Sequence, residues 1–234
     1  MFLLVPKNYN YMKLILNSLF LILFLVCGPV YGEGFYKEFN IRVSGIKIGK
    51  LFWTIKIDDT VYLNDLRLRS EGLLSSIYSF EGEYYSEGVV INNKLKPHKY
   101  KHVWKTKKIK KDMKLTFEND KLNSLNQTPY EKERLRLGVF NIKQTKDPLT
   151  SFLQIILGET SCLVIDGRRI YSMNAAFNKK NDETIVEISN YSNLWADHKR
   201  SKFEKITFKK KDGELFPLNI KIYFDGRVFK LEQN

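Results

Sequence analysis

Residues 51–57 read LFWTIKI, and this stretch decides the fold class. Every second position in it is apolar, whereas the positions between them include Lys56. This alternation is typical of a β-strand with one buried face and one face in water. The same alternation recurs in residues 100–105, 113–118 and 220–225. The chain therefore predicts a mainly β fold, with roughly nine to eleven strands in an antiparallel sheet.

Short turn signals separate the predicted strands, and one longer polar segment interrupts them. The turn pairs are Asn92-Asn93, Asp166-Gly167, Asp212-Gly213 and Asp225-Gly226. Asn, Asp and Gly tolerate the positive φ angles that tight hairpin turns need. Residues 120–136 are polar and contain Pro129, so we expect a long surface loop there.

One segment, residues 147–157, has helical rather than strand spacing. Asp147 is a suitable N-cap, and Pro148 suits the first helical position. Its apolar residues fall three or four apart, and Gly158 is a natural stop. We therefore predict a curved antiparallel sheet or half-barrel with this short helix packed on its concave face. No internal repeat or linker is apparent, so residues 33–234 are predicted to form one domain.

Residues 1–32 carry a different signal. A lysine precedes an uncharged, largely apolar run from Leu14 to Val26, and the stretch Gly28-Pro29-Val30-Tyr31-Gly32 follows. A basic residue, a short apolar segment and a small-residue exit are typical of a secretory signal peptide. We predict such a peptide, with Met12 as an alternative start, and an exported domain after it. An uncleaved inner-membrane anchor and lipid attachment at Cys27 stay open as alternatives.

The chain is basic, with a formal net charge of +13 at pH 7. Five lysines of one segment form a lysine cluster: Lys105, Lys107, Lys108, Lys110 and Lys111. Such a surface suits anionic lipid head groups, an anionic membrane or an acidic envelope partner, and the alternative is an ordinary solvated face. The arginines and aromatic residues of a nucleic-acid platform are missing from the cluster, so we predict no nucleic-acid partner. We also expect a monomer.

The sequence offers little support for catalysis, metal binding or a cofactor. His98 and His102 are predicted to share a strand face, but at about 3.3 Å per residue they are roughly 13 Å apart, too far for one ion. No serine lies in a Gly-x-Ser-x-Gly turn, and no glycine-rich phosphate loop is present. Cys162 is expected to be a buried small hydrophobe. We therefore predict a non-enzymatic protein without metal or cofactor, and an unrecognised hydrolase stays an alternative.

Aromatic residues are abundant, with 13 Tyr, 16 Phe and 3 Trp. A curved sheet commonly holds a ligand between its concave face and a covering element. The residues predicted to line such a cavity are Trp53, Tyr78, Phe80, Tyr100, Trp104, Phe152 and Phe177. The alternative is a filled core without a cavity.

Two adjacent arginines follow the predicted turn at Asp166-Gly167. Arg168 and Arg169 should leave on opposite faces of the next strand. We expect one of them to be buried and paired with Asp147 or Glu187. Anion binding by an arginine is the alternative.

Four motifs together resemble an exported bacterial family catalogued as domain of unknown function 3108. They are VSGIKIG at residues 43–49, LKP at 95–97, DPLTSFL at 147–153 and VIDGRRIY at 164–171. The resemblance implies a periplasmic, mostly antiparallel β protein, akin to the half-barrel of lipoprotein carriers, which shelter acyl chains between a curved sheet and short helices. It implies no catalytic residues. The expected function is a binding or carrier module for a lipid, lipoprotein or other amphiphile, and the alternative is a structural or interaction protein of the envelope that uses a basic face.

Overall fold

The computed structural model describes residues 34–72, 75–76, 79–136, 138–195 and 203–234, which belong to one compact unit. The predicted signal peptide, the alternative start and Cys27 lie outside the described residues, as does Tyr78. No helix in the described ranges is long and apolar enough to cross a membrane.

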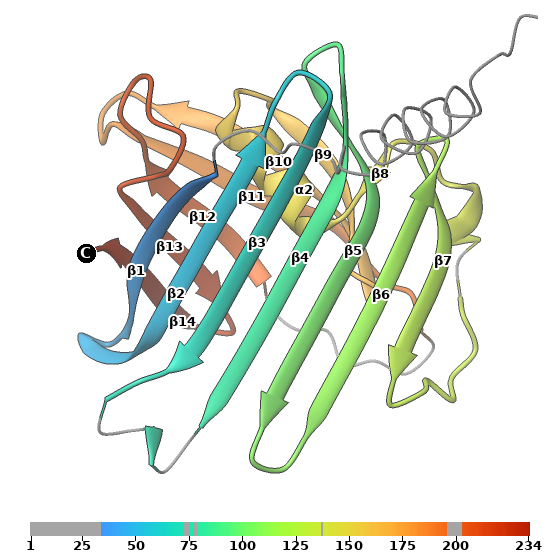
Figure 1. Cartoon of the computed structure of the whole chain (residues 1–234), viewed down its shortest axis with the longest axis horizontal. Helices are drawn as coiled ribbons and strands as arrows, with labels where there is room; N and C mark the ends of the chain where they lie inside the picture. Colours follow the sequence, from blue (N-terminus) through green and yellow to red (C-terminus); the bar gives the residue numbers. More distant parts are fainter. Residues whose placement is uncertain (1–33, 73–74, 77–78, 137, 196–202) are drawn as a thin grey trace, which may run out of the picture. The chain divides into compact units, whose positions relative to one another are not determined.

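The described residues form one sheet of fourteen strands (Figure 1). In chain order they are β1 (Phe35–Val43), β2 (Ile46–Ile57), β3 (Val61–Ser70), β4 (Phe80–Ile91), β5 (Lys94–Thr106), β6 (Lys110–Glu118), β7 (Lys121–Thr128), β8 (Thr145–Lys146), β9 (Ser161–Ile165), β10 (Arg169–Asn178), β11 (Glu183–Asn193), β12 (Phe203–Lys209), β13 (Asn219–Phe224) and β14 (Arg227–Gln233). A short 3₁₀ helix, η2 (Val139–Asn141), precedes β8. The mainly β, antiparallel fold is confirmed, and among the described strands only β8 and β9 pair in parallel. The strand number is higher than the sequence indicated.

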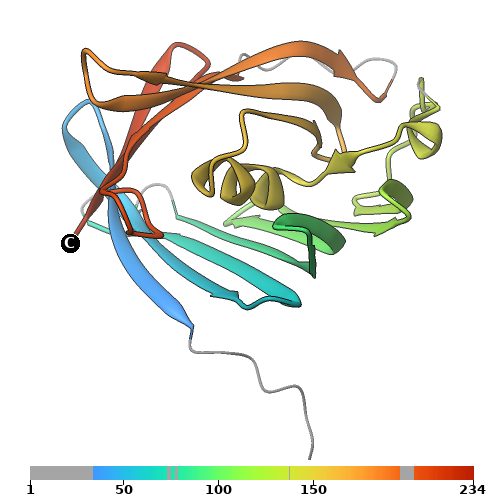
Figure 2. The same cartoon turned by 90° about the horizontal axis from the view of Figure 1, so that it is seen from above.

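Pairing between the two ends of the chain curls this sheet into a nearly closed barrel. Strand β1 pairs with β2 on one side and with β14 on the other, so that Ile41 lies opposite Leu231. The strand order is therefore β7-β6-β5-β4-β3-β2-β1-β14-β13-β12-β11-β10-β9-β8. The two edges also meet, because a bridge joins Lys121 of β7 to Lys143, just before β8. Viewed from above, the strands form a wall that curves almost all the way round (Figure 2).

The helix α2 (Pro148–Ile156) lies inside this barrel (Figure 2). Both its predicted N-cap, Asp147, and its position on the concave face are confirmed. Its C-terminal half is tied to one end of the barrel. Gln154 Oε1 accepts a hydrogen bond of 2.5 Å from Leu95 N beside the β4–β5 turn, and Lys210 Nζ donates to Ile156 O at 2.9 Å beyond β12. The helix therefore plugs this end, called here the plugged end.

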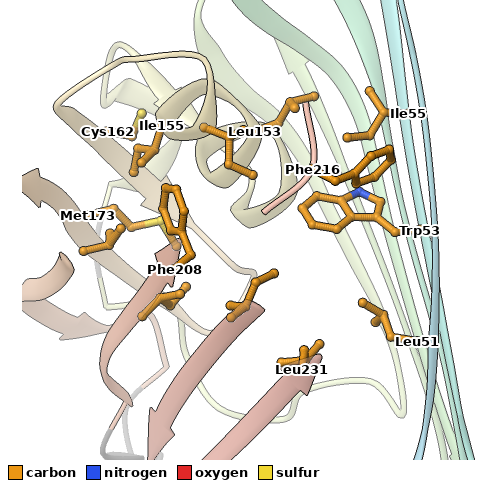
Figure 3. Close-up of a cluster of buried hydrophobic side chains, with 14 of the residues drawn as sticks. Leu51, Trp53, Ile55, Leu153, Ile155, Cys162, Met173, Phe208, Phe216 and Leu231 are labelled. Atoms are coloured by element: carbon orange, nitrogen blue, oxygen red, sulfur yellow. The ribbon is translucent and has the colours of Figure 1, made fainter. Parts of the chain in front are cut away.

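The apolar core packs around α2. In Figure 3, Leu51, Trp53 and Ile55 of β2 face Met173, Phe208 and Leu231 across the interior, with Leu153 and Ile155 of α2 between them. Trp53 is almost fully buried, and its ring stacks on Phe152 of α2 at 6.0 Å between centroids. Phe216 meets Trp53 edge-on at 5.3 Å. Burial of these rings gives the helix an apolar contact with the barrel wall.

A buried polar cluster fixes the N-terminus of α2 to the wall. Asp147 Oδ1 accepts hydrogen bonds from the backbone N–H groups of Leu149 and Thr150, at 3.0 and 2.9 Å. Its Oδ2 accepts from the hydroxyls of Ser86, on β4, and Thr150, at 2.9 and 2.5 Å. The Thr150 hydroxyl also contacts Tyr62 OH and Ser86 Oγ, each at 2.7 Å. Strands β3 and β4 therefore hold the first helical turn through side-chain hydrogen bonds.

Asp147 therefore accepts four hydrogen bonds at a fully buried position. Burial raises the pKa of Asp147, although the hydrogen bonds it accepts oppose the shift. Because the pKa of Asp147 is higher in the folded state than in the unfolded chain, its protonation stabilises the fold at low pH. This stability is lost as the pH rises through the folded-state pKa.

The predicted surface loop at residues 120–136 is partly wrong, because residues 121–128 form the edge strand β7. Asn119 and Asp120 adopt positive φ angles of 50° and 61° and make a hairpin from β6 to β7. Leu122 points into the core at 2% exposure, whereas most of its neighbours on β7 are partly or fully exposed. With a buried Leu122, a partly buried Leu125 three positions later and polar residues elsewhere, this edge strand leaves a weak alternation signal.

Replacing Asp147 separates its capping role from its charge. We expect Asp147→Ala to lower the free energy of unfolding by about 3 kcal/mol, because a cap is lost and buried donors lose their acceptor. Asp147→Asn keeps a capping side-chain oxygen and removes a charge that burial disfavours, so we expect a change within about 1 kcal/mol. Urea unfolding followed by circular dichroism measures both. Equal losses in the two variants would contradict a cap that acts through the side-chain oxygen.

Gly167 and Gly213 form a matched pair for testing the β9–β10 hairpin. Both have positive φ, 81° and 78°, but only at Gly167 would a Cβ atom collide, at 1.7 Å from Met113 Sδ. Gly213→Ala should cost about 1–2 kcal/mol for the left-handed backbone alone. Gly167→Ala should cost more than that by about 1–3 kcal/mol, because the hairpin must move away from β6. Equal costs in thermal or urea unfolding would show that the hairpin does not dock on Met113.

Candidate functional site

A cavity of about 820 Å³ lies between α2 and the end of the barrel opposite the plugged end. This second end, called here the mouth, carries the β1–β2, β3–β4, β5–β6, β9–β10 and β13–β14 connections. Val43, Phe80, Trp104, Arg168 and Phe224 all line the cavity from these connections or beside them. Most of the other lining residues are apolar. The volume falls within the roughly 300–1,000 Å³ of ordinary ligand pockets.

Strand register arranges the wall of β2 to β6 in rows of side chains at increasing height above the helix. The lowest row, level with the buried polar cluster, is Ile55, Asn64, Ser86, Tyr100 and Leu115. The middle row is Trp53, Leu66, Tyr84, His102 and Met113, and the rim row is Leu51, Leu68, Gly82, Trp104 and Lys111. The strand register therefore places polar residues at the base of the cavity, aromatic residues on its wall and a lysine at its rim.

The structure places five of the seven predicted aromatic residues around the cavity: Trp53, Phe80, Tyr100, Trp104 and Phe152. Phe80 and Trp104 stack at 5.5 Å near the mouth. Phe177 does not line the cavity and is 61% exposed. It has the inward parity of Met173 but lies at the plugged end of β10, beyond the helix. Tyr78 is outside the described residues.

The two arginines after the β9–β10 turn behave differently from each other, and neither pairs as predicted. Arg169 Nε pairs with Asp166 Oδ2 at 3.1 Å, instead of with Asp147 or Glu187. The Arg169 guanidinium also donates to Tyr191 OH at 2.5 Å. Asp166 is only three residues away, and the turn itself brings the two side chains together. Arg168 is half-buried, lines the cavity and forms no ion pair with any described carboxylate.

His102 lies in the aromatic wall of the cavity. Its ring stacks on Tyr84 with centroids 4.2 Å apart, and among the described residues its Nε2 atom has no hydrogen-bond partner. Burial lowers its pKa to about 4, and the nearby charges of Arg168 and Lys111 add to the shift against a smaller opposing effect of Asp112. The predicted face shared with His98 is wrong, because a bulge at Pro97–Lys99 changes the side-chain parity and leaves His98 exposed.

The lysine cluster lies on the β5–β6 hairpin at the mouth (Figure 1). Lys105 pairs with Glu81 at 3.3 Å on the outside of the barrel, and Lys107 Nζ donates to Ser76 O at 2.7 Å. Lys108 and Lys110 are exposed. Lys111 is also exposed, but it lies opposite Trp104 in the register and so has the inward parity of the rim row.

Sequence reasoning missed many residues at this site, among them Tyr84, His102 as a lining residue, and Arg227. The first two were detectable, because His102 is two positions from Trp104 and Tyr84 is its direct partner in the antiparallel register. Arg227 reaches the cavity only because β14 pairs with β1, and no local pattern reveals that contact.

The described residues contain no group of three or more His, Cys, Asp or Glu side chains that could hold a metal ion. Cys162, on β9, is free and buried, in agreement with the sequence prediction. The part of the chain that the structure describes therefore offers an apolar cavity with a cationic entrance as its main candidate site.

Comparison with known proteins gives one family and one solved structure. The family model described as "Protein of unknown function (DUF3108)" matches residues 38–191. A structural match is the beta-barrel-like protein of domain of unknown function DUF1849 from Brucella abortus, with a TM-score of 0.45 and 10% sequence identity, covering 85% of this chain and 95% of that one. No curated protein matches the sequence.

The lowered pKa of His102 predicts a pH-dependent stability. As pH falls from about 6.5 towards 4, the unfolded chain takes up this proton first, so unfolding becomes easier by at most about 3 kcal/mol. His102→Phe keeps an aromatic ring against Tyr84 but cannot titrate. The unfolding free energy of the parent protein should therefore fall relative to that of His102→Phe as pH falls from about 6.5 towards 4. A difference that does not vary with pH would show that His102 is freely protonated in the folded state.

Proposed function

We propose that this chain, which belongs to the DUF3108 family of proteins of unknown function, is a non-enzymatic binding module that receives the apolar part of an amphiphile in its cavity. The amphiphile is a lipid, an acylated protein or a related molecule. The observation that carries the proposal is a cavity of about 820 Å³ with mainly apolar walls and a cationic mouth.

Packing physics favours a ligand over an empty interior. Protein interiors are normally close-packed, and voids larger than a water molecule are few because they forfeit contacts. In this barrel the base is filled by Trp53, Phe152 and Phe216, whereas the space above them is open. An acyl chain there would cover the exposed ring faces and contribute roughly 25 cal/mol per Å² of apolar surface removed from water.

The cavity wall gives the hydrolase alternative no support. Its polar members are His102, Asp166, three arginines and the three tyrosines Tyr84, Tyr100 and Tyr171, and it includes no Ser, Thr or Cys side chain among the described residues. The Asp166 carboxylate accepts hydrogen bonds from two backbone N–H groups and from Arg169. These groups suit binding and positioning rather than nucleophilic attack.

The proposal includes export to the periplasm, which the leader-like pattern of residues 1–32 supports. A second candidate function is contact with an anionic membrane or envelope partner through the lysine cluster. Lys108 and Lys110 favour it, because both are exposed and neither forms an ion pair with a described residue. The two functions are compatible, because the cluster lies at the mouth through which an amphiphile would pass.

A cavity-filling variant tests the binding function. Ile222 lines the cavity from β13, whereas its neighbour Tyr223 faces outward and lies beneath Lys205. With the neutral fluorescent probe N-phenyl-1-naphthylamine, we expect Ile222→Trp to weaken binding by about tenfold or more, which is about 1.4 kcal/mol. Tyr223→Trp, on the same strand, should bind the probe like the parent protein.

Both variants are first compared in thermal unfolding, so that only folded proteins are titrated with the probe. No saturable binding by the parent protein, or equal binding by Ile222→Trp and the parent, would contradict a role for the cavity.

A further inference from the structure

Three cations face the mouth of the cavity without a carboxylate partner in the described residues. Arg168 comes from the β9–β10 connection, Lys111 from β6 and Arg227 from the start of β14. Arg168 and Arg227 line the cavity directly, and Lys111 lies in the rim row opposite Trp104. Elsewhere on the barrel, many cations have partners, for example Arg42 with Glu232 at 3.2 Å and Lys50 with Glu38 at 3.5 Å. The mouth is therefore a place where positive charge is left uncompensated.

Docking of the β9–β10 hairpin brings Arg168 to Lys111. Gly167 lies so close to Met113 that a Cβ atom on Gly167 would be 1.7 Å from the Met113 sulfur. Trp195 Nε1 also donates a hydrogen bond of 3.0 Å to the backbone oxygen of Gly167. Met113 is two residues from Lys111 on the inward face of β6. Consistent with this proximity, the Arg168 charge is the main cause that lowers the pKa of Lys111. Two like charges thus lie near each other at the rim of an apolar wall.

The nearby carboxylates do not neutralise this pair. Asp166 is engaged by the backbone N–H groups of Arg168 and Arg169 and by the Arg169 side chain. Asp112 has the parity opposite to Lys111 and lies on the outer face of β6, opposite Val103. Glu81 is on the outside of β4 with Lys105. The positive charges of Arg168 and Lys111 repel each other, and the apolar wall beside them screens this repulsion poorly. A bound anion between them would remove the repulsion.

We propose that the cavity selects amphiphiles with a compact anionic head group, a carboxylate or a phosphate, held between Arg168 and Lys111 while the chain extends towards Trp53 and Phe152. Arg168 supplies a planar fork that matches both head groups, and Lys111 supplies a point charge. Arg227 flanks the head group from the β14 side. This inference rests on the proposed binding function, because it assigns the polar end of the same ligand.

Head-group selectivity is measured by displacement of N-phenyl-1-naphthylamine with tetradecyl probes that differ only at one end. The set is tetradecanoate, tetradecyl phosphate, tetradecanol and tetradecyltrimethylammonium, each below its micelle concentration. We expect the two anions to bind about tenfold or more tightly than the alcohol, and the cation to bind most weakly. The carboxylate and phosphate arms show which anion fits better.

Three single substitutions locate the effect. Arg168→Gln and Lys111→Gln should each remove most of the preference for anions, measured as the ratio of anion affinity to tetradecanol affinity in the same variant. Lys110→Gln is the matched control, because it removes an adjacent charge of the same hairpin from the opposite face. It should leave the preference intact.

The outcomes separate the two proposals. If the neutral probe binds but the anions show no advantage, or if Lys110→Gln reduces the preference as much as Arg168→Gln and Lys111→Gln, the head-group site is overturned and the binding function stands. If neither the neutral probe nor any tetradecyl compound binds, the binding function itself fails. An anionic preference lost in both Arg168→Gln and Lys111→Gln supports the site.

Discussion

The arrangement of the whole interior depends on one buried carboxyl group. Asp147 is fully buried, caps α2 and joins that helix to the wall through the hydroxyls of Ser86 and Thr150. A short helix alone is marginally stable in water, so it needs such tertiary contacts to persist. Its C-terminal half is fixed separately, through Gln154 and the contact of Lys210 with Ile156. Because both ends are held, α2 closes one end of the barrel and leaves the other end open.

The cavity and its charge follow from that plug and from strand register. Side chains of β2 to β6 that share a face fall into rows, so the depth of each residue is set by its pairing partner rather than by its type. The base row is filled and polar where it meets α2, and the two rows above it are mainly apolar, with Trp53, Tyr84 and His102 in the middle row and Trp104 in the rim row. At the rim, Lys111 and the docked β9–β10 hairpin bring positive charge to the edge of an apolar surface. An apolar interior below a cationic rim is complementary to an anionic amphiphile.

Local features of this fold were readable from the sequence. Alternation in residues 51–57 and the cap at Asp147 depend on neighbours within one strand or one turn, and both predictions are confirmed. Closure of the sheet was not readable, because it requires β1 to pair with β14 from the other end of the chain. Phe177 shows the same limit, since parity indicates the face of a strand but not its height above the helix. Arg169 pairs with Asp166 because the intervening turn brings them together, whereas the predicted partners were distant in sequence.

The most direct measurement is a crystal structure of the protein with a tetradecyl phosphate that carries bromine at the end of its chain. If the cavity holds the chain and the mouth holds the head group, anomalous scattering will place bromine beside Trp53 and Phe152, with the phosphate between Arg168 and Lys111. Bromine found only on the outer surface of the barrel, with the cavity closed by repacked side chains, would contradict a ligand-binding interior.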